Sequence, residues 1–136
     1  MIAKYNTQIN IDGKNYPIID AEAQKNLVYS QNEIDTGKIW IDGKKIYRKV
    51  ILLPAIAKGT EYRIDLSSIT ASNYIQLYGF IKAGENYFVP LLNSDEKTQT
   101  LNTFVGITNN VLRFLNGEGR EILSGHVILE YTKTTN

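Results

Sequence analysis

The serine and histidine that lie closest together are the first candidates for catalytic chemistry. Ser124 precedes His126, the only histidine in the chain, by two residues. In a β-strand such residues share one face. A serine activated by histidine also requires an acid that orients the imidazole and donors that stabilise an oxyanion, and the sequence has no G-x-S-x-G turn. We therefore interpret His126 as a structural strand residue.

Carboxylates and glycines form no catalytic or cofactor-binding set either. Glycoside hydrolysis needs two carboxylates that face each other across the sugar, but Asp12 and Asp42 belong to Asp-Gly turns and Asp95 lies in a polar loop. The Gly-Glu-Gly string at residues 117–119 lacks the third glycine and the following helix of a phosphate-binding loop. The chain has no cysteine, so thiolate metal ligands and cysteine nucleophiles are excluded. The sequence predicts a protein that is not an enzyme, with no metal site and no cofactor.

Basic residues gather in one stretch, at Lys44, Lys45, Arg48 and Lys49. Such a group can contact phosphate, but the net charge of +1 creates no field that would attract nucleic acid or an anionic membrane. We interpret the group as the solvated face of a hairpin, and we expect no nucleic-acid or membrane partner. The N-terminus lacks the features of a signal peptide, and no apolar run approaches the ~20 residues of a membrane helix.

Turn chemistry predicts the elements that position these residues. The Asp-Gly pair at residues 42–43 stands between two apolar runs, which favours a hairpin with a two-residue turn and positive φ at both turn positions. In that register Ile39 opposes Ile46 on one face, and Trp40 and Tyr47 share the other face.

A second hairpin and a short helix are predicted upstream of this hairpin. The same Ile-x-Ile-Asp-Gly-Lys string occurs at residues 9–14 and predicts another hairpin. Asp20 can then cap a short helix over Ala21–Leu27, which would depend on packing because it has two turns or fewer.

Alternating apolar residues predict strands through the rest of the chain. In Tyr74–Lys82 we expect Tyr74 beside Tyr78 and Phe80 on one face, and Pro90 indicates an edge strand. The predicted strands are Val50–Leu53, Tyr62–Leu66, Tyr74–Lys82, Tyr87–Leu92, Phe104–Thr108, Val111–Leu115 and Gly125–Lys133. Such short strands, joined by close turns, predict an all-β antiparallel sandwich or barrel. Of the two we expect the sandwich, preceded by the short hairpin and the short helix.

Two stretches resemble parts of a known family. Residues 37–50 contain Gly-Lys-Ile-Trp-Ile-Asp-Gly-Lys followed by Ile-Tyr-Arg-Lys, and residues 127–136 read Val-Ile-Leu-Glu-Tyr-Thr-Lys-Thr-Thr-Asn. They are similar to the beginning and the end of the tip domains of bacteriophage tail fibres and receptor-binding proteins. Between them, the Tyr-Phe-Val-Pro-Leu run at residues 87–91 and the strand pair around residues 109–110 fall in the order expected for that family.

The resemblance implies a virion protein of a tail fibre, baseplate or head fibre, made in the cytoplasm of the bacterial host. Such a protein displays a β-sandwich for attachment to a glycan or protein of the host surface, commonly as a homotrimer. As a whole, the resemblance covers roughly Tyr29 to Asn136. Tip domains usually follow a long shaft, whereas here only residues 1–28 precede the similar region. We therefore expect residues 1–36 to form an attachment and linker segment that binds other virion proteins, and residues 37–136 to form the tip-like domain.

The family has no fixed receptor-binding motif, so exposed loops supply the candidates for receptor contact. These are Asn93, Asp95, Asn109, Asn110 and Asn116. The candidates for packing between subunits, or at the joint with the attachment segment, are Trp40, Tyr47 and Tyr78.

Two other functions remain open. One is a capsid or tail decoration protein that oligomerises and has no receptor. The other is a virion enzyme that degrades surface polysaccharide, which the lack of paired carboxylates disfavours.

Overall fold

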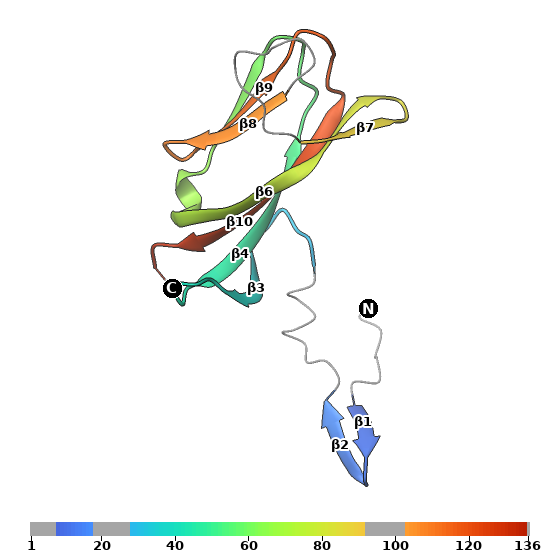
Figure 1. Ribbon diagram of the computed structural model, residues 1–136, viewed down its shortest axis with the longest axis vertical. Coiled ribbons are helices and arrows are strands. Elements are labelled where there is room, and N and C mark those ends of the chain that lie inside the picture. Colours follow the sequence, from blue (N-terminus) through green and yellow to red (C-terminus); the bar gives the residue numbers. More distant parts are fainter. Residues whose placement is uncertain (1–7, 18–27, 92–102, 136) are drawn as a thin grey trace.

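The computed structural model describes residues 8–17, 28–91 and 103–135, and strands dominate these ranges (Figure 1). The strands are β1 (Gln8–Ile11), β2 (Lys14–Pro17), β3 (Ile34–Ile39), β4 (Lys45–Leu53), β5 (Glu61–Asp65), β6 (Ala71–Gly84), β7 (Tyr87–Pro90), β8 (Thr103–Thr108), β9 (Val111–Asn116) and β10 (Ser124–Lys133). The described residues contain no α-helix, only the 3-10 turn η1 (Ser67–Ile69). The helix predicted for Ala21–Leu27 lies outside the described residues.

The strands form two larger antiparallel sheets and one separate hairpin. The five-stranded sheet has the order β3-β4-β10-β6-β7, the three-stranded sheet has the order β5-β9-β8, and β1 pairs with β2. The prediction of an all-β antiparallel fold is confirmed. β7, which contains Pro90, lies at the edge of its sheet, as predicted, because a proline has no N–H to donate to a further strand.

One apolar core receives side chains from both larger sheets. β10 lies in the middle of the five-stranded sheet, and its Val127, Leu129 and Tyr131 are fully buried. The predicted alternation of this strand is confirmed, since these three residues share one face. From the three-stranded sheet, Leu112 and Phe114 enter the same core. Each large apolar side chain buried in this way contributes about 1.5–3 kcal/mol.

The tight turn predicted at residues 12–13 forms as expected, and a second turn of the same kind joins β8 to β9. At residues 12–13, Asp12 and Gly13 have φ of 52° and 73°, and Ile11 opposes Lys14. Asn109 and Asn110, with φ of 50° and 61°, join β8 to β9 in the same way. Positive φ at both central residues defines this hairpin turn, which Asn, Asp and Gly adopt most readily.

The hairpin between β3 and β4 departs from the predicted register. Ile39 opposes Lys45 rather than Ile46, and the backbone N–H of Trp40 donates to the carbonyl of Lys44 at 2.8 Å. The loop therefore has three residues, and the prediction of a two-residue turn is wrong. As a consequence Ile39 is 59% exposed, whereas Ile46 is buried.

The chemistry of Asp42 explains the different turn. Its side-chain oxygen accepts the backbone N–H of Lys44 at 3.0 Å, and Gly43 donates its N–H to the carbonyl of Trp40 at 2.9 Å. Gly43 has φ of 84°, but Asp42 keeps a negative φ. This combination is a three-residue loop with a glycine bulge, the next most common hairpin connection.

β6 carries a bulge that changes which residues face the core. Its register against β10 shifts between Glu130 and Tyr131, which leaves Ile75 as the extra residue. Tyr74 consequently turns inward and packs against the core. The prediction that Tyr74 shares a face with Tyr78 is wrong, because one extra residue reverses the alternation.

The residues just before β4 also belong to the folded domain. β3 begins at Ile34, so the predicted boundary between residues 36 and 37 falls inside a strand. Further upstream, the carbonyl of Ser30 accepts the N–H of Val50 at 2.8 Å. The carbonyl of Val28 accepts a guanidinium N–H of Arg48, also at 2.8 Å.

Candidate functional site

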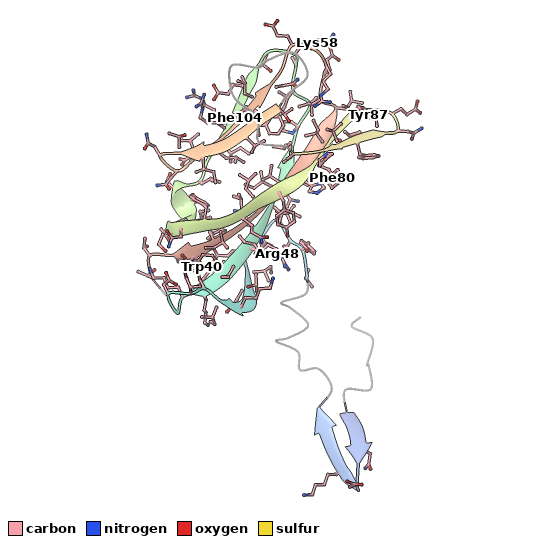
Figure 2. All side chains as sticks on the ribbon, viewed as in Figure 1. Trp40, Arg48, Lys58, Phe80, Tyr87 and Phe104 are labelled. Carbon is pink, nitrogen blue, oxygen red and sulfur yellow. The ribbon has the colours of Figure 1, made fainter. Side chains whose placement is uncertain are left out.

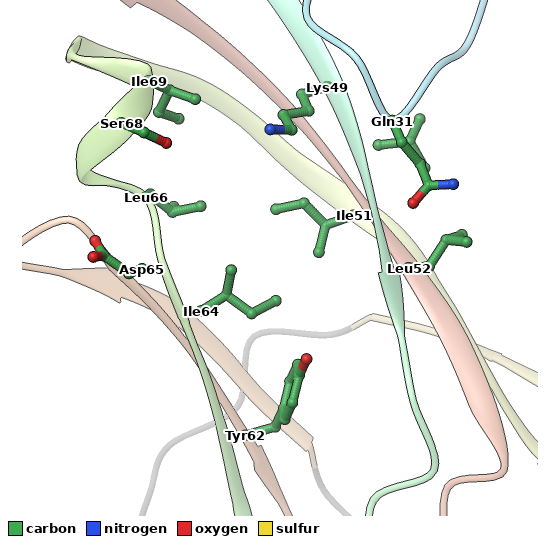
Figure 3. Close-up of a pocket in the computed structure, with 11 residues that line it drawn as sticks. Gln31, Lys49, Ile51, Leu52, Tyr62, Ile64, Asp65, Leu66, Ser68 and Ile69 are labelled. Carbon is green, nitrogen blue, oxygen red and sulfur yellow. The ribbon is translucent and has the colours of Figure 1, made fainter.

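A cleft opens where an edge of the five-stranded sheet faces an edge of the three-stranded sheet. β3 pairs with β4 only up to Arg48, and β5 is the outermost strand of its own sheet. A cavity of about 330 Å³ lies between β4 and β5 (Figure 3). It is lined by Gln31, Lys49, Val50, Ile51, Leu52, Tyr62, Ile64, Asp65, Leu66, Ser68 and Ile69. Its size is at the lower end of the range typical of small-molecule sites.

The walls of the cleft are apolar. Ile51 points from β4 toward Ile64 of β5, and Leu66 and Ile69 continue that wall at η1 (Figure 3). Strand alternation produces this arrangement, because Tyr62, Ile64 and Leu66 stand at every second position. Leu66 and Ile69 are buried, and Ile51 and Ile64 are partly buried against the core.

Three polar groups reach into this apolar space. Lys49 extends its amine from β4 across the cleft, the Ser68 hydroxyl points toward the cleft from η1, and the Tyr62 hydroxyl points into it (Figure 3). Lys49 is half-buried and opposes Leu129 of β10, so it stands in the inward-facing row of its sheet. Within the residues that the structure describes, its amine has no hydrogen-bond or ion-pair partner.

The acid at the rim does not neutralise this lysine. Asp65 points to the opposite side of β5 (Figure 3), where its carboxylate accepts the backbone N–H of Ser67 at 2.9 Å and the hydroxyl of the same residue. These hydrogen bonds lower the pKa of Asp65, so the acid stays ionised and is satisfied locally.

A closed polar cluster lies on the same inward face, next to the cleft. The Tyr131 hydroxyl donates to Glu33 at 2.6 Å, and Lys133 forms an ion pair with the same carboxylate. Burial and the bond to Glu33 raise the pKa of Tyr131 well above its ordinary value. Tyr47 stacks on Tyr131 with 6.3 Å between ring centroids and lies 4.8 Å from the amine of Lys133. Tyr47, a predicted packing residue, therefore packs within its own sheet.

One part of the outer face of the five-stranded sheet carries exposed apolar and aromatic side chains. Tyr78 and Phe80 are 37% and 47% exposed, and Leu52 on β4 is 57% exposed. His126 lies here in β10, with its ring 6.5 Å from that of Phe80. Burial and a hydrogen bond with Tyr29 raise the pKa of Tyr78 to about 12.

The basic residues do not form one solvated face, and that interpretation is wrong. Lys45 forms an ion pair with Asp35 at 3.4 Å, and Lys44 approaches the Ser72 hydroxyl at 3.4 Å. Arg48 is only 7% exposed, because the Tyr29 ring covers its guanidinium at 4.1 Å. Residues of one strand alternate between faces, so neighbouring basic residues are separated.

The predicted contact residues are scattered over the structure. Asn109 and Asn110 lie exposed in the β8–β9 turn, and Asn93 and Asp95 lie outside the described residues. Asn116 was predicted in a loop, but it ends β9 and is 1% exposed.

The side chain of Asn116 is committed to the fold. Its amide nitrogen donates to the carbonyls of Ile56, Ala57 and Arg120 at 2.8–3.3 Å. Trp40 is half-buried at the β3–β4 end of the domain, away from Lys58 at the opposite end (Figure 2). Of the predicted contact and packing residues that the structure describes, none lines the cleft.

Sequence reasoning missed Lys49 as a site residue, although a signal was present. Tyr47 and Ile51 flank it at i−2 and i+2, and both pack against the core. A lysine between two inward-facing residues of one strand must itself face inward. The signal was overlooked because the four basic residues were interpreted together.

Comparison with known proteins found no match: no family model, no curated protein and no solved structure is similar to this chain. Among the described residues no group of His, Cys, Asp or Glu side chains could hold a metal ion. In that same part of the chain, no helix has the length and apolar character needed to cross a bilayer.

Proposed function

We propose that the chain is a bacteriophage virion protein, a tail fibre, baseplate or head fibre component that displays its β-domain for attachment to the host surface. The proposal begins from the two sequence stretches that resemble phage tip domains. It also accords with the all-β fold. In this proposal the inter-sheet cleft is the binding site.

One structural observation carries the proposal. The two similar stretches are distant in sequence, but they lie in adjacent strands, because β4 pairs with β10 from Tyr47↔Tyr131 to Leu53↔Gly125. The strands of both stretches, β3 and β4 in the first and β10 in the second, are thus neighbours in a single sheet. The two similar stretches are therefore neighbours in space, as the beginning and the end of one domain.

The finer architecture and the assembly belong to the same proposal. We describe the two larger sheets as a β-sandwich because both contribute to one core. The exposed apolar side chains of Leu52, Tyr78 and Phe80 favour self-association, for which the resemblance suggests a trimer. Light scattering that gives a monomer at working concentrations would contradict this part.

Virion composition tests the proposal directly. Mass spectrometry of purified particles, from a culture in which this chain is produced, should detect it in stoichiometric amounts. The purified protein should also bind the host cells of those particles and compete with their adsorption. Absence of the chain from the particles would overturn the proposal.

A structural decoration protein is the second candidate, and the exposed outer face favours it. Here the chain oligomerises on the particle and contacts no receptor. Removal of residues 1–27 should release the domain from particles without unfolding it, since the described contacts of the domain begin at Val28. Particles that keep the chain, but whose adsorption is not inhibited by the purified protein, would identify this role.

A further inference from the structure

Among the described residues that line the cleft, Lys49 is the only cation, and its position is unusual. Both of its neighbours in the inward row of β4 pack against the core, and its cross-strand partner Leu129 is fully buried. The Lys49 side chain is half-buried, and within the described residues no acceptor or carboxylate pairs with its amine. A long apolar side chain would fill the same space without placing a charge in the cleft.

The side chains around Lys49 indicate which kind of ligand could pair with its amine. The Ser68 hydroxyl points toward the cleft from the opposite wall, and the Tyr62 hydroxyl enters it from β5 (Figure 3). Apolar surface from Ile51 and Ile64 separates these polar groups. A complementary ligand therefore carries one anionic group, several hydroxyls and an apolar ring face.

We propose that the cleft binds an anionic sugar unit, with its carboxylate or phosphate at the Lys49 amine and its ring against Ile51 and Ile64. The hydroxyls of Ser68 and Tyr62 bond to the sugar hydroxyls. Charge complementarity selects this occupant, because Asp65 points away from the cleft and accepts hydrogen bonds from Ser67. The inference rests on the proposed function in taking the cleft as the receptor site.

Amide chemical shifts of the full-length protein test the proposal. Separate titrations would use glucuronic acid, glucose 6-phosphate, glucose and inorganic phosphate. We expect shifts at residues of β4, β5 and η1 with an anionic sugar, with affinity about tenfold above that for glucose, the factor expected from one charge-assisted hydrogen bond. The stronger of the two anionic sugars identifies the anion. Equal affinity for glucose, or no shifts at the cleft, overturns the proposal, and inorganic phosphate that binds as well as the sugars overturns its sugar part.

Matched variants assign the effect to one amine. Lys49→Met keeps the length and apolar stem of the side chain and removes the charge, so it should abolish the preference for the anionic sugars. Lys38→Met removes an exposed charge on β3 and should leave the preference unchanged. A Lys49→Met variant that is folded, by the dispersion of its amide spectrum, and keeps the preference would contradict the proposal. If that variant does not fold, Lys49→Arg replaces it: its planar guanidinium should retain the preference and change the ratio between carboxylate and phosphate.

Failure of the sugar-binding proposal and failure of the attachment proposal give different experimental results. Anionic-sugar binding by a chain that is absent from virions would support the ligand assignment and remove the virion role. A chain found in virions, whose Lys49→Met variant adsorbs to cells as well as the wild type, would support attachment and overturn this inference.

Discussion

Two polar side chains in the inward row of the five-stranded sheet lie in opposite environments. Tyr131 is fully buried, and its hydroxyl is bonded to Glu33, which also pairs with Lys133. Lys49 is half-buried and has no partner in the described part of the chain. The first region is completed by the protein itself, whereas the second is left open. We infer that the Tyr131 cluster serves the fold, whereas the amine of Lys49 is available to a ligand.

Asn116 should show the largest effect, because it satisfies three carbonyls from inside the fold. Asn116→Ala removes the donor to Ile56, Ala57 and Arg120. Urea denaturation should show a loss of about 3 kcal/mol in the free energy of unfolding. Asn73→Ala, at an exposed site of β6, should change that free energy by less than about 0.5 kcal/mol. Similar values for the two variants would contradict the assignment of Asn116 to the fold.

Tyr131→Phe should have the next largest effect. The variant keeps the ring that stacks on Tyr47 but removes the hydroxyl from Glu33, at a cost of about 2 kcal/mol for a hydrogen bond to a charged group. The same change at Tyr87, which is 58% exposed, is the control and should be nearly neutral. If Tyr131→Phe leaves the free energy of unfolding unchanged, the Tyr131 cluster contributes no more to stability than the open region around Lys49.

The free energy of unfolding at alkaline pH should report on the buried hydroxyl of Tyr131. The folded-state pKa of Tyr131 is raised, so its stabilising contribution is complete below the unfolded-state pKa of about 10 and is lost as pH rises through the folded-state pKa. The free energy of unfolding should fall above about pH 10, by at most about 1.4 kcal/mol per pH unit for this one group. Tyr131→Phe should have a shallower decline, and a slope equal to that of the wild type would argue against the buried hydroxyl as its source.

The strands followed from the sequence, but their partners did not. Period-two alternation identifies β10 because its inward residues are all large and apolar, and Asp12-Gly13 identifies a turn whose geometry few other residues adopt. The same Asp-Gly pair at residues 42–43 gave a different turn, since Asp42 bonds to the N–H of Lys44. Local sequence does not distinguish these two solutions.

The candidate site could be predicted even less, because it depends on non-local pairing. The cleft exists because β3 leaves β4 after Arg48 and β5 is the outermost strand of another sheet. No pattern within a single strand shows that Ile51 will face Ile64. The bulge at Ile75, which turns Tyr74 inward, is equally invisible to an alternation rule. Only the inward position of Lys49 could have been recognised.

The unfolding free energy of Lys49→Met, measured without ligand, tests the central claim most directly. If Lys49 is present for a ligand rather than for the fold, the apolar variant should be as stable as the wild type or more stable by up to about 1 kcal/mol, because it removes a charge from an apolar cleft without removing a contact to any described residue. A loss of about 2 kcal/mol, comparable to the loss expected for Tyr131→Phe, would show that Lys49 has a partner within the fold and would contradict the account.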